Sequence, residues 1–130
     1  MAKFVEFNNA GTNGQIDAAH DYVCYPVEAF KGATIVGTTR TQITLYFTAM
    51  EGQVEIAANA YPADIHDAIL LNITTDTHPT VMKKLLALMH PENNHSGAQL
   101  ISIADDMNVV YAIPEITSID SITVQVVAAA

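Results

Sequence analysis

Cysteine and tryptophan are nearly absent from this chain of 130 residues, which has one cysteine and no tryptophan. A single cysteine excludes an intrachain disulfide. Cys24 is flanked by Asp21 and two tyrosines, whereas a catalytic thiol is normally activated by a neighbouring cation. We therefore expect Cys24 to be a small buried hydrophobic residue. The lack of tryptophan argues further against a site that stacks on sugar rings.

Positive charge is scarce as well. Five lysine and arginine residues stand against fourteen aspartate and glutamate residues, which gives a formal net charge of −9. The cations are Lys3, Lys31, Arg40, Lys83 and Lys84, and only the last two are adjacent. A nucleic-acid partner requires a clustered basic surface, so we expect none. The negative field also repels acidic partners, so self-association must come from apolar or backbone contacts.

Long hydrophobic runs are missing too. No run approaches the roughly twenty apolar residues that are needed to cross a bilayer. The N-terminal residues 1–6 lack the hydrophobic stretch of a signal peptide. We therefore expect no membrane partner, and we expect synthesis in a cytoplasm.

Strand-forming segments dominate what is present, and half of the residues are hydrophobic. In the segment 41–50, Ile43, Leu45 and Phe47 alternate with other residues, which is the period-two pattern of a strand with one packed face. The continuous apolar run at 66–74 is typical of a central strand that is buried on both faces. Further strands are expected at 3–7, 21–29, 33–38, 53–58, 99–104, 108–113 and 121–127, with 99–104 and 108–113 forming a hairpin.

One helix is expected at about 79–90. Pro79 suits its first turn, one of the residues 76–78 can cap it, and Pro91 requires the helix to end before it. The apolar face of this helix carries Val81, Met82, Leu85, Leu86, Leu88 and Met89. Such an amphipathic pattern is typical of a helix that lies on a sheet.

These elements predict a single domain over residues 1–130 that is mainly β or α+β. Its expected architecture is an antiparallel β-sandwich or a rolled sheet with one amphipathic helix. A doubly wound parallel fold would need more helices than the pattern contains. A domain of this size buries about two-thirds of the surface of its unfolded chain, so it needs no metal or disulfide to fold.

The histidines are the best candidates for a metal or catalytic site, and four of them stand out: His66, His78, His90 and His95. His90 and His95 lie on either side of Pro91, so they do not form the helical pair of metalloproteases. A metal site needs several ligands that converge. Local hydrogen bonding by loop and cap histidines is the simpler interpretation.

Two carboxylate pairs, Asp64/Asp67 and Asp105/Asp106, are candidates for glycoside hydrolysis, which needs two carboxyl groups facing each other across a cleft. Adjacent aspartates in a turn are far more often turn formers. The sequence has no phosphate-binding glycine loop, dinucleotide fingerprint or nucleophile elbow. We therefore expect that the chain is not an enzyme, and we assign no catalytic, cofactor-binding or metal-binding residue.

Threonine and serine residues crowd the expected strands and their ends. They are Thr38, Thr39, Thr41, Thr44, Thr48, Thr74, Thr75, Thr117, Ser118, Ser121 and Thr123. This composition fits β propensity on a solvent face, and it fits equally a flat, uncharged surface that packs against another protein. The apolar stretch 126–130 would fray in water, so we expect contact with a neighbouring chain or with its own domain to hold it.

In the second half of the chain, a strand at 67–73 leads into the helix at 79–90. His95-Ser96-Gly97 and a strand that ends at Asp105 follow, and then Val110-Tyr111-Ala112 and Ser121-Ile122-Thr123-Val124. This order resembles small proteins of marine tailed phages, among them cyanophage virion proteins. The resemblance implies a structural protein of the particle, in the first place a capsid decoration (cement) protein located in the virion. It implies copies of the chain and a major capsid protein as partners, and no functional residue is carried over from it.

The first hypothesis is therefore a non-enzymatic virion structural protein that stabilises a shell through many repeated contacts. Its closest rival is a tail-tube or other homopolymeric β-protein, for which residues 22–50 would supply a long exposed hairpin. A second class is a small metal-binding domain or enzyme that uses His66, His78, His90 or His95. A third class is a regulatory binding module that acts as a monomer or dimer.

Overall fold

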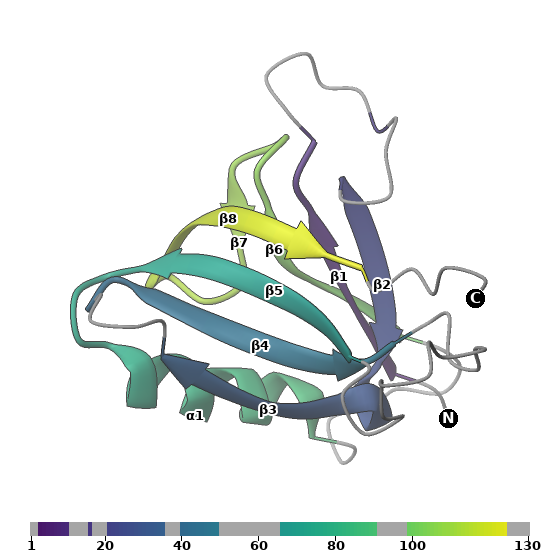
Figure 1. Cartoon of the computed structure of the whole chain (residues 1–130), viewed down its shortest axis with the longest axis horizontal. Coiled ribbons are helices and arrows are strands. Elements are labelled where there is room, and N and C mark those ends of the chain that lie inside the picture. Colours follow the sequence, from purple (N-terminus) through teal and green to yellow (C-terminus); the bar gives the residue numbers. More distant parts are fainter. Residues whose placement is uncertain are drawn as a thin grey trace, which may run out of the picture.

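Two four-stranded sheets pack together in the computed structural model, with one helix of 12 residues beside them (Figure 1). The structure describes residues 3–10, 16, 21–35, 40–49, 66–90 and 99–124. The mainly β, sandwich-like fold that the sequence pattern predicts is thereby confirmed. The segments 53–58 and 126–130, for which we expected a strand and an ordered end, lie outside the described residues.

The first sheet has the strand order β2-β1-β6-β7. Its strands are β1 (Lys3–Asn8), β2 (Tyr22–Pro26), β6 (Gln99–Asp105) and β7 (Val110–Tyr111). The expected hairpin of 99–104 with 108–113 is confirmed, because β6 and β7 pair antiparallel. The neighbours β1 and β6 are parallel, which departs from a purely antiparallel sandwich. Parallel neighbours need a long connection, and the chain between β1 and β6 is long enough for the two strands to pair in either orientation.

The second sheet has the order β3-β4-β5-β8, and all of its neighbours are antiparallel. Its strands are β3 (Phe30–Ile35), β4 (Gln42–Thr48), β5 (His66–Ile73) and β8 (Ile116–Thr123). The segment expected as one extended piece at 21–29 ends as a strand at Pro26 and continues as a short 3₁₀ turn, Val27–Ala29, that leads into the other sheet.

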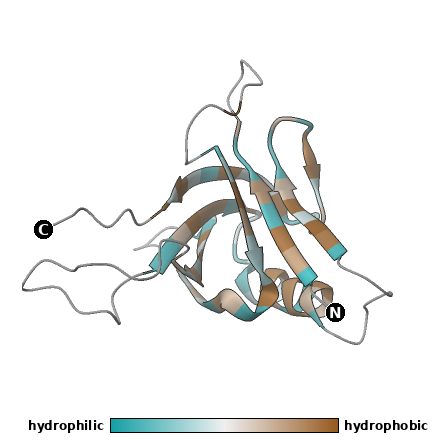
Figure 2. Ribbon diagram, turned by 90° about the vertical axis from the view of Figure 1, so that its right-hand side faces the viewer, coloured by the Kyte–Doolittle hydropathy of each residue, from teal (hydrophilic) through white to brown (hydrophobic). Residues whose placement is uncertain are grey.

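The core lies between the two sheets and is centred on aromatic rings. The Tyr25 ring stacks on Phe47 with 4.4 Å between ring centroids, and Phe7 meets Phe47 edge-on at 5.8 Å. Ile43, Leu45 and Phe47 are all buried, which confirms the inward face predicted for this strand. Hydrophobic and hydrophilic residues are interspersed along the strands in Figure 2.

The central position predicted for β5 is confirmed, but its burial on both faces is wrong. Asp67, Ile69, Leu71 and Ile73 are buried, and the residues between them are only half-buried. The apolar composition of this strand therefore reflects its place between β4 and β8 rather than cover on both sides.

The last strand begins earlier than predicted, at Ile116 instead of residue 121. Its buried residues are Ile116, Ile119 and Ile122, which are spaced by three. The pairing of β8 with β5 contains two register shifts. Each bulge inserts an extra residue, so the apolar side chains return to the inner face every third position and the period-two pattern is hidden.

The helix α1 (His78–Met89) matches the predicted bounds within one residue and lies along the lower side of the sandwich beside β3 (Figure 1). Val81, Leu85 and Met89 are buried, whereas Leu86, which we placed on the apolar face, is 53% exposed. The buried Lys3 donates a 2.8 Å hydrogen bond from Nζ to the carbonyl oxygen of His90, so β1 holds the end of the helix.

Candidate interaction surface

The described histidines do not converge. His78 lies at the start of α1, and its Nε2 is 2.8 Å from the carbonyl oxygen of Gln42 on β4. His66 lies at the start of β5 with its ring 4.8 Å from that of Tyr46, and His90 follows the end of α1. Among the residues whose structure is described, no group of three or more His, Cys, Asp or Glu side chains could hold a metal ion. His95 lies outside them.

The described aspartates of the two candidate carboxylate pairs, Asp64/Asp67 and Asp105/Asp106, make structural hydrogen bonds in different parts of the fold. Asp67 is fully buried and accepts a 2.7 Å hydrogen bond from the Tyr25 hydroxyl, and Asp64 lies outside the described residues. Asp105 accepts bonds from the backbone NH of Asn108 at 3.1 Å and from its side-chain amide at 2.9 Å, so it is a turn former as predicted.

Asp106 joins the two sheets. Its carboxylate accepts a 2.6 Å bond from the Tyr111 hydroxyl and two 3.1 Å contacts from the backbone NH of Ile119 on β8. Burial, together with this hydrogen bond, raises the pKa of Tyr111 to about 12. The adjacent aspartates thus stabilise a turn and its attachment, and they do not face each other across a cleft.

Cys24 is half-buried rather than buried as predicted. It lies on β2 opposite Glu6 of β1. Burial and the charge of Glu6 raise the pKa of the Cys24 thiol. A raised pKa favours the protonated thiol over the thiolate, which is the nucleophilic form.

The strand β3 is the most exposed strand of the fold and an edge of its sheet. On its inner side it pairs with β4, and in the part of the chain that the structure describes no strand pairs with its other side. Its second half, Ala33, Thr34 and Ile35, is exposed on both faces. Its first half carries Lys31 and a bulge at Gly32, whose φ of 138° suits only glycine.

An apolar hollow lies between β3 and the first turns of α1. The hollow has a volume of about 170 Å³ and is lined by Ala33, Thr34, Ile35, Ile43, His78, Pro79 and Met82. Ile35 faces the buried Ile43 across the ladder, so it lies on the core side of the sheet, but it is 57% exposed. Among the residues that the structure describes, the hollow is therefore an uncovered end of the core.

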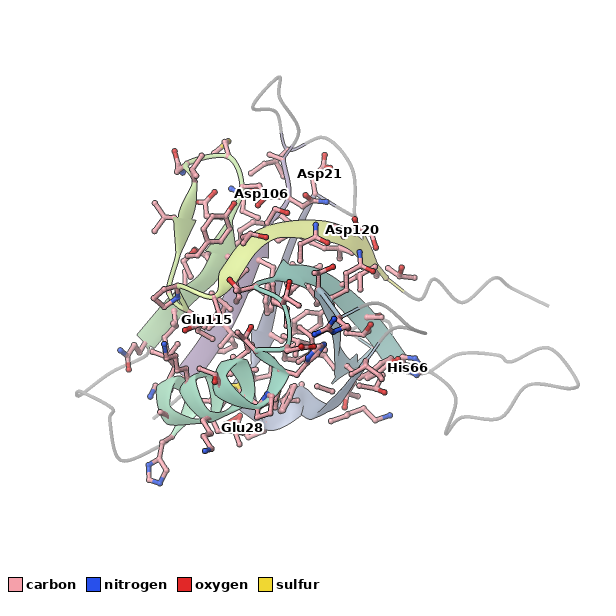
Figure 3. The ribbon with its side chains drawn as sticks, turned by 90° about the vertical axis from the view of Figure 1, so that its left-hand side faces the viewer. Asp21, Glu28, His66, Asp106, Glu115 and Asp120 are labelled. Atoms are coloured by element: carbon pink, nitrogen blue, oxygen red, sulfur yellow. The ribbon has the colours of Figure 1, made fainter. Side chains whose placement is uncertain are left out.

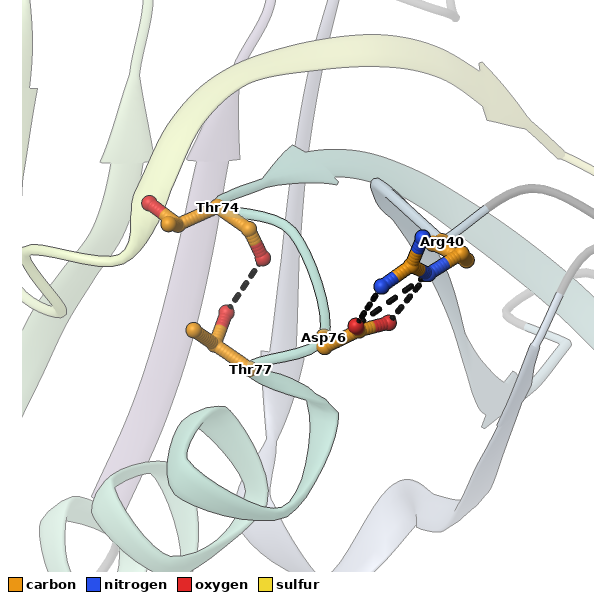
Figure 4. Close-up of polar contacts among 4 residues, drawn as sticks. All are labelled: Arg40, Thr74, Asp76 and Thr77. Atoms are coloured by element: carbon orange, nitrogen blue, oxygen red, sulfur yellow. Dashed lines mark hydrogen bonds and ion pairs between the residues drawn. The ribbon is translucent and has the colours of Figure 1, made fainter.

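Polar contacts fix the helix beside this hollow (Figure 4). The guanidinium of Arg40 binds the Asp76 carboxylate, with Nε at 2.9 Å from Oδ1, and the Asp76 backbone NH donates to the Arg40 carbonyl at 2.9 Å. The side-chain hydrogen bond from Arg40, together with the charge of the guanidinium, lowers the pKa of the Asp76 carboxyl group. The Thr77 hydroxyl donates to the Thr74 carbonyl at 2.7 Å. Thr77 occupies the N-cap position of α1 without the side-chain cap that we expected.

Most of the described threonine and serine residues are exposed, as expected for a solvent face, and an ordered polar row runs among them. The Gln42 amide donates to Asn72 at 3.0 Å, and the Asn72 amide donates to the Ser118 hydroxyl at 2.8 Å. The row thus crosses β4, β5 and β8. Thr44 is buried, contrary to expectation, whereas Thr48 and Thr123 are exposed.

A second apolar surface, which the sequence interpretation missed, lies at the tip of the β6–β7 hairpin. Met107, Val109 and Val110 are 39%, 74% and 55% exposed. Val109 has a φ of 55°, a left-handed conformation that is a strong outlier for a β-branched residue. The signal was present in the sequence: two large apolar residues occupy a turn that begins with two aspartates.

Comparison of the chain with protein-family models, with curated proteins and with solved structures finds no match. Within the described ranges, no helix is long and apolar enough to cross a membrane. The features of the described residues that bear on function are the two apolar surfaces, their neighbouring charges and the exposed sheet edge.

Proposed function

We propose that this chain is a non-enzymatic structural protein that assembles through repeated protein–protein contacts, as a capsid decoration (cement) protein of a virion. The observation that carries the proposal is the outer half of β3, where an exposed strand edge adjoins an apolar hollow of about 170 Å³. Backbone NH and C=O groups on such an edge form hydrogen bonds with another chain, and this binding needs no metal or cofactor.

Natural edge strands are usually protected by charge, proline, bulges or a covering segment. The first half of β3 has two of these devices, Lys31 and the bulge at Gly32. The second half, 33–35, has neither charge nor proline and ends in the exposed Ile35. An unprotected apolar edge is a liability for an isolated protein, so a role for it in assembly explains why it is present.

The charge of the chain agrees with contacts of this kind. A formal net charge of −9 makes copies repel at a distance. Assembly therefore needs local apolar and backbone contacts, which is what the edge and the hollow supply. Each contact of this size is modest, and symmetry multiplies it across a shell.

The virion setting is supported by the resemblance of residues 67–124 to cyanophage virion proteins. The partners in that setting are further copies of the chain and a major capsid protein. A tail tube is the second candidate, and it is favoured by the exposed outer strand of the β3–β4 hairpin. The longer hairpin expected over 22–50 is wrong, because β2 pairs within the other sheet.

Light scattering coupled to size exclusion tests the proposal, run over a wide range of protein concentrations with and without EDTA. We expect a trimer, a ring or a larger concentration-dependent assembly that EDTA does not change. A monomer at every concentration would contradict the proposal. A monomer that unfolds with EDTA would also contradict it and would direct attention to the histidines.

A further inference from the structure

We propose that the apolar tip of the β6–β7 hairpin of one copy inserts into the hollow between β3 and α1 of a second copy. The tip consists of Met107, Val109 and Val110. The proposal rests on the proposed function, because it names the partner of the β3 surface and the segment that occupies it. It predicts a head-to-tail contact between identical chains.

The strained backbone of the tip keeps the side chain of Val109 exposed to solvent, and this conformation lowers the stability of the fold. Val109 is the most exposed large hydrophobic residue that the structure describes, at 74%. Its φ of 55° is strained for valine, and asparagine or glycine would relieve the strain. Strained residues that are kept in a fold are candidates for function. An outward-facing valine in a turn that prefers asparagine is explained by a partner that needs valine.

The tip is also rigid, which favours binding because little conformational entropy remains to be lost. Asp105 holds Asn108 through two hydrogen bonds, to its backbone NH and to its side-chain amide. Asp106 ties the base of the turn to Tyr111 and to the backbone of Ile119 in the other sheet. The tip therefore projects from the sandwich as a fixed knob.

The hollow matches this knob in size and chemistry. A buried apolar cavity of about 150 Å³ accommodates a benzene molecule, so a hollow of about 170 Å³ has room for a valine side chain. Its apolar wall consists of Ala33, Ile35, Ile43, Pro79 and Met82. An inserted valine would cover Ile35, which lies on the core side of β3 and remains exposed in the single chain.

Charge favours the same pairing. Two carboxylates, Asp105 and Asp106, begin the turn that forms the tip. No acidic residue lines the hollow among those described, and Lys83 directly follows Met82 of its wall. Lys31 lies on β3 two residues before Ala33. The Arg40–Asp76 ion pair beside the hollow is neutral as a whole, so Lys31 and Lys83 leave the surroundings of the hollow with a net positive charge.

The tip and the hollow lie at opposite ends of the molecule. In Figure 1 the hairpin of β6 and β7 is at the top, and β3 with α1 is at the bottom. Figure 3 agrees, with the labelled Asp106 at the end away from α1. A contact between two different surfaces is heterologous, and it generates a ring or a filament depending on the rotation between copies.

Complementation between two defective variants tests the proposal. Val109→Asp disables the tip and leaves the hollow intact, and Ile35→Asp disables the hollow and leaves the tip intact. Both residues are exposed, so both variants should fold. We expect each variant alone to associate at least tenfold more weakly than the parent chain. Mixed in equal amounts, they should form a dimer and nothing larger, because only one productive contact remains.

A matched control separates this contact from general surface hydrophobicity. Leu100 is 55% exposed on β6 and lies outside the turn. Leu100→Asp should leave the association unchanged. Val109→Asn should raise the melting temperature, because asparagine accepts a positive φ, and should weaken association by the same tenfold or more. A substitution that only made the surface less stable would lower both the melting temperature and the association, whereas Val109→Asn should change them in opposite directions.

The outcomes distinguish this proposal from the proposed function. If the parent chain assembles and both variants assemble equally well, the docking of the tip is wrong and the structural function stands. If the mixed variants remain monomeric, the pairing of these two surfaces is wrong. If the parent chain is a monomer at every concentration, the proposed function fails and this inference fails with it.

Discussion

The Tyr25 hydroxyl donates a 2.7 Å hydrogen bond to Oδ2 of Asp67, and both side chains are fully buried. Tyr25 belongs to β2 of the first sheet and Asp67 to β5 of the second, so this bond joins the sheets across the core. Burial, with a smaller contribution from the bond to Asp67, raises the pKa of Tyr25. The tyrosine is therefore always a donor in the native state.

Tyr25→Phe should destabilise the fold by about 1–3 kcal/mol, because it leaves a buried carboxylate without one of its donors. The ring remains, so the stacking on Phe47 is kept. Urea unfolding followed by circular dichroism measures the change. Tyr46→Phe is the control and should cost under about 0.5 kcal/mol, as is usual for a partly exposed position. Equal losses in the two variants would contradict the structural role of the bond.

The two adjacent leucines of α1 should respond very differently to the same substitution. Leu85 is fully buried and Leu86 is 53% exposed. Leu85→Ala should cost about 2–5 kcal/mol through lost burial and a residual cavity. Leu86→Ala should stay within about 0.5 kcal/mol of the parent. Thermal or urea unfolding of the pair tests the orientation of the helix, and similar losses in both variants would show that the orientation is wrong.

This orientation illustrates what the sequence could predict. The alternation of Ile43, Leu45 and Phe47 fixed the inner face of β4, and prolines on both sides bounded α1. The same periodicity could not say which part of a broad apolar stripe meets the sheet, so Leu86 was placed wrongly. Only the tertiary arrangement, with β3 on one side of the helix, decides that question.

Long-range pairing and bulges were beyond the sequence pattern. The parallel pairing of β1 with β6 joins segments about a hundred residues apart, and no local signal reports it. In β8 two bulges give Ile116, Ile119 and Ile122 a spacing of three, which resembles neither a strand nor a helix. The hollow depends on the same kind of information, because it lies between β3 and α1, two elements that are distant from each other in the chain.

Tyr111, in the β6–β7 hairpin, should lose its proton at a higher pH than an ordinary tyrosine. Burial and the hydrogen bond to Asp106 raise the pKa of Tyr111 to about 12, against an ordinary value of 10.0. A raised folded-state pKa means that the contribution of Tyr111 to stability is complete below about pH 10. It is lost as the pH rises from there through about 12.

Absorbance at alkaline pH measures the ionisation of Tyr111, and urea unfolding over the same pH range measures its contribution to stability. The free-energy difference between the parent chain and Tyr111→Phe should shrink between pH 10 and 12. The tyrosinate absorbance of the parent chain should contain a step near pH 12 that the variant lacks. A difference in stability that stays constant over this range would contradict the role of Asp106 as acceptor.

The outer half of β3 provides the most direct test of assembly. Thr34 is exposed and lies in the part of the edge that has no protecting charge. Thr34→Lys introduces the residue that natural edge strands use against pairing, because its charged end would have to leave water when another chain covers the edge. We expect it to weaken self-association about tenfold or more while the melting temperature of the dilute monomer changes little.

Thr48→Lys is its matched control, because it adds the same charge at an exposed position on β4, which is not an edge. Analytical ultracentrifugation over a range of concentrations should show parental association for Thr48→Lys and weakened association for Thr34→Lys. If both variants lose association equally, net charge controls assembly and the edge of β3 does not. If neither loses it, the contacts lie elsewhere on the molecule, and the exposed edge needs another explanation.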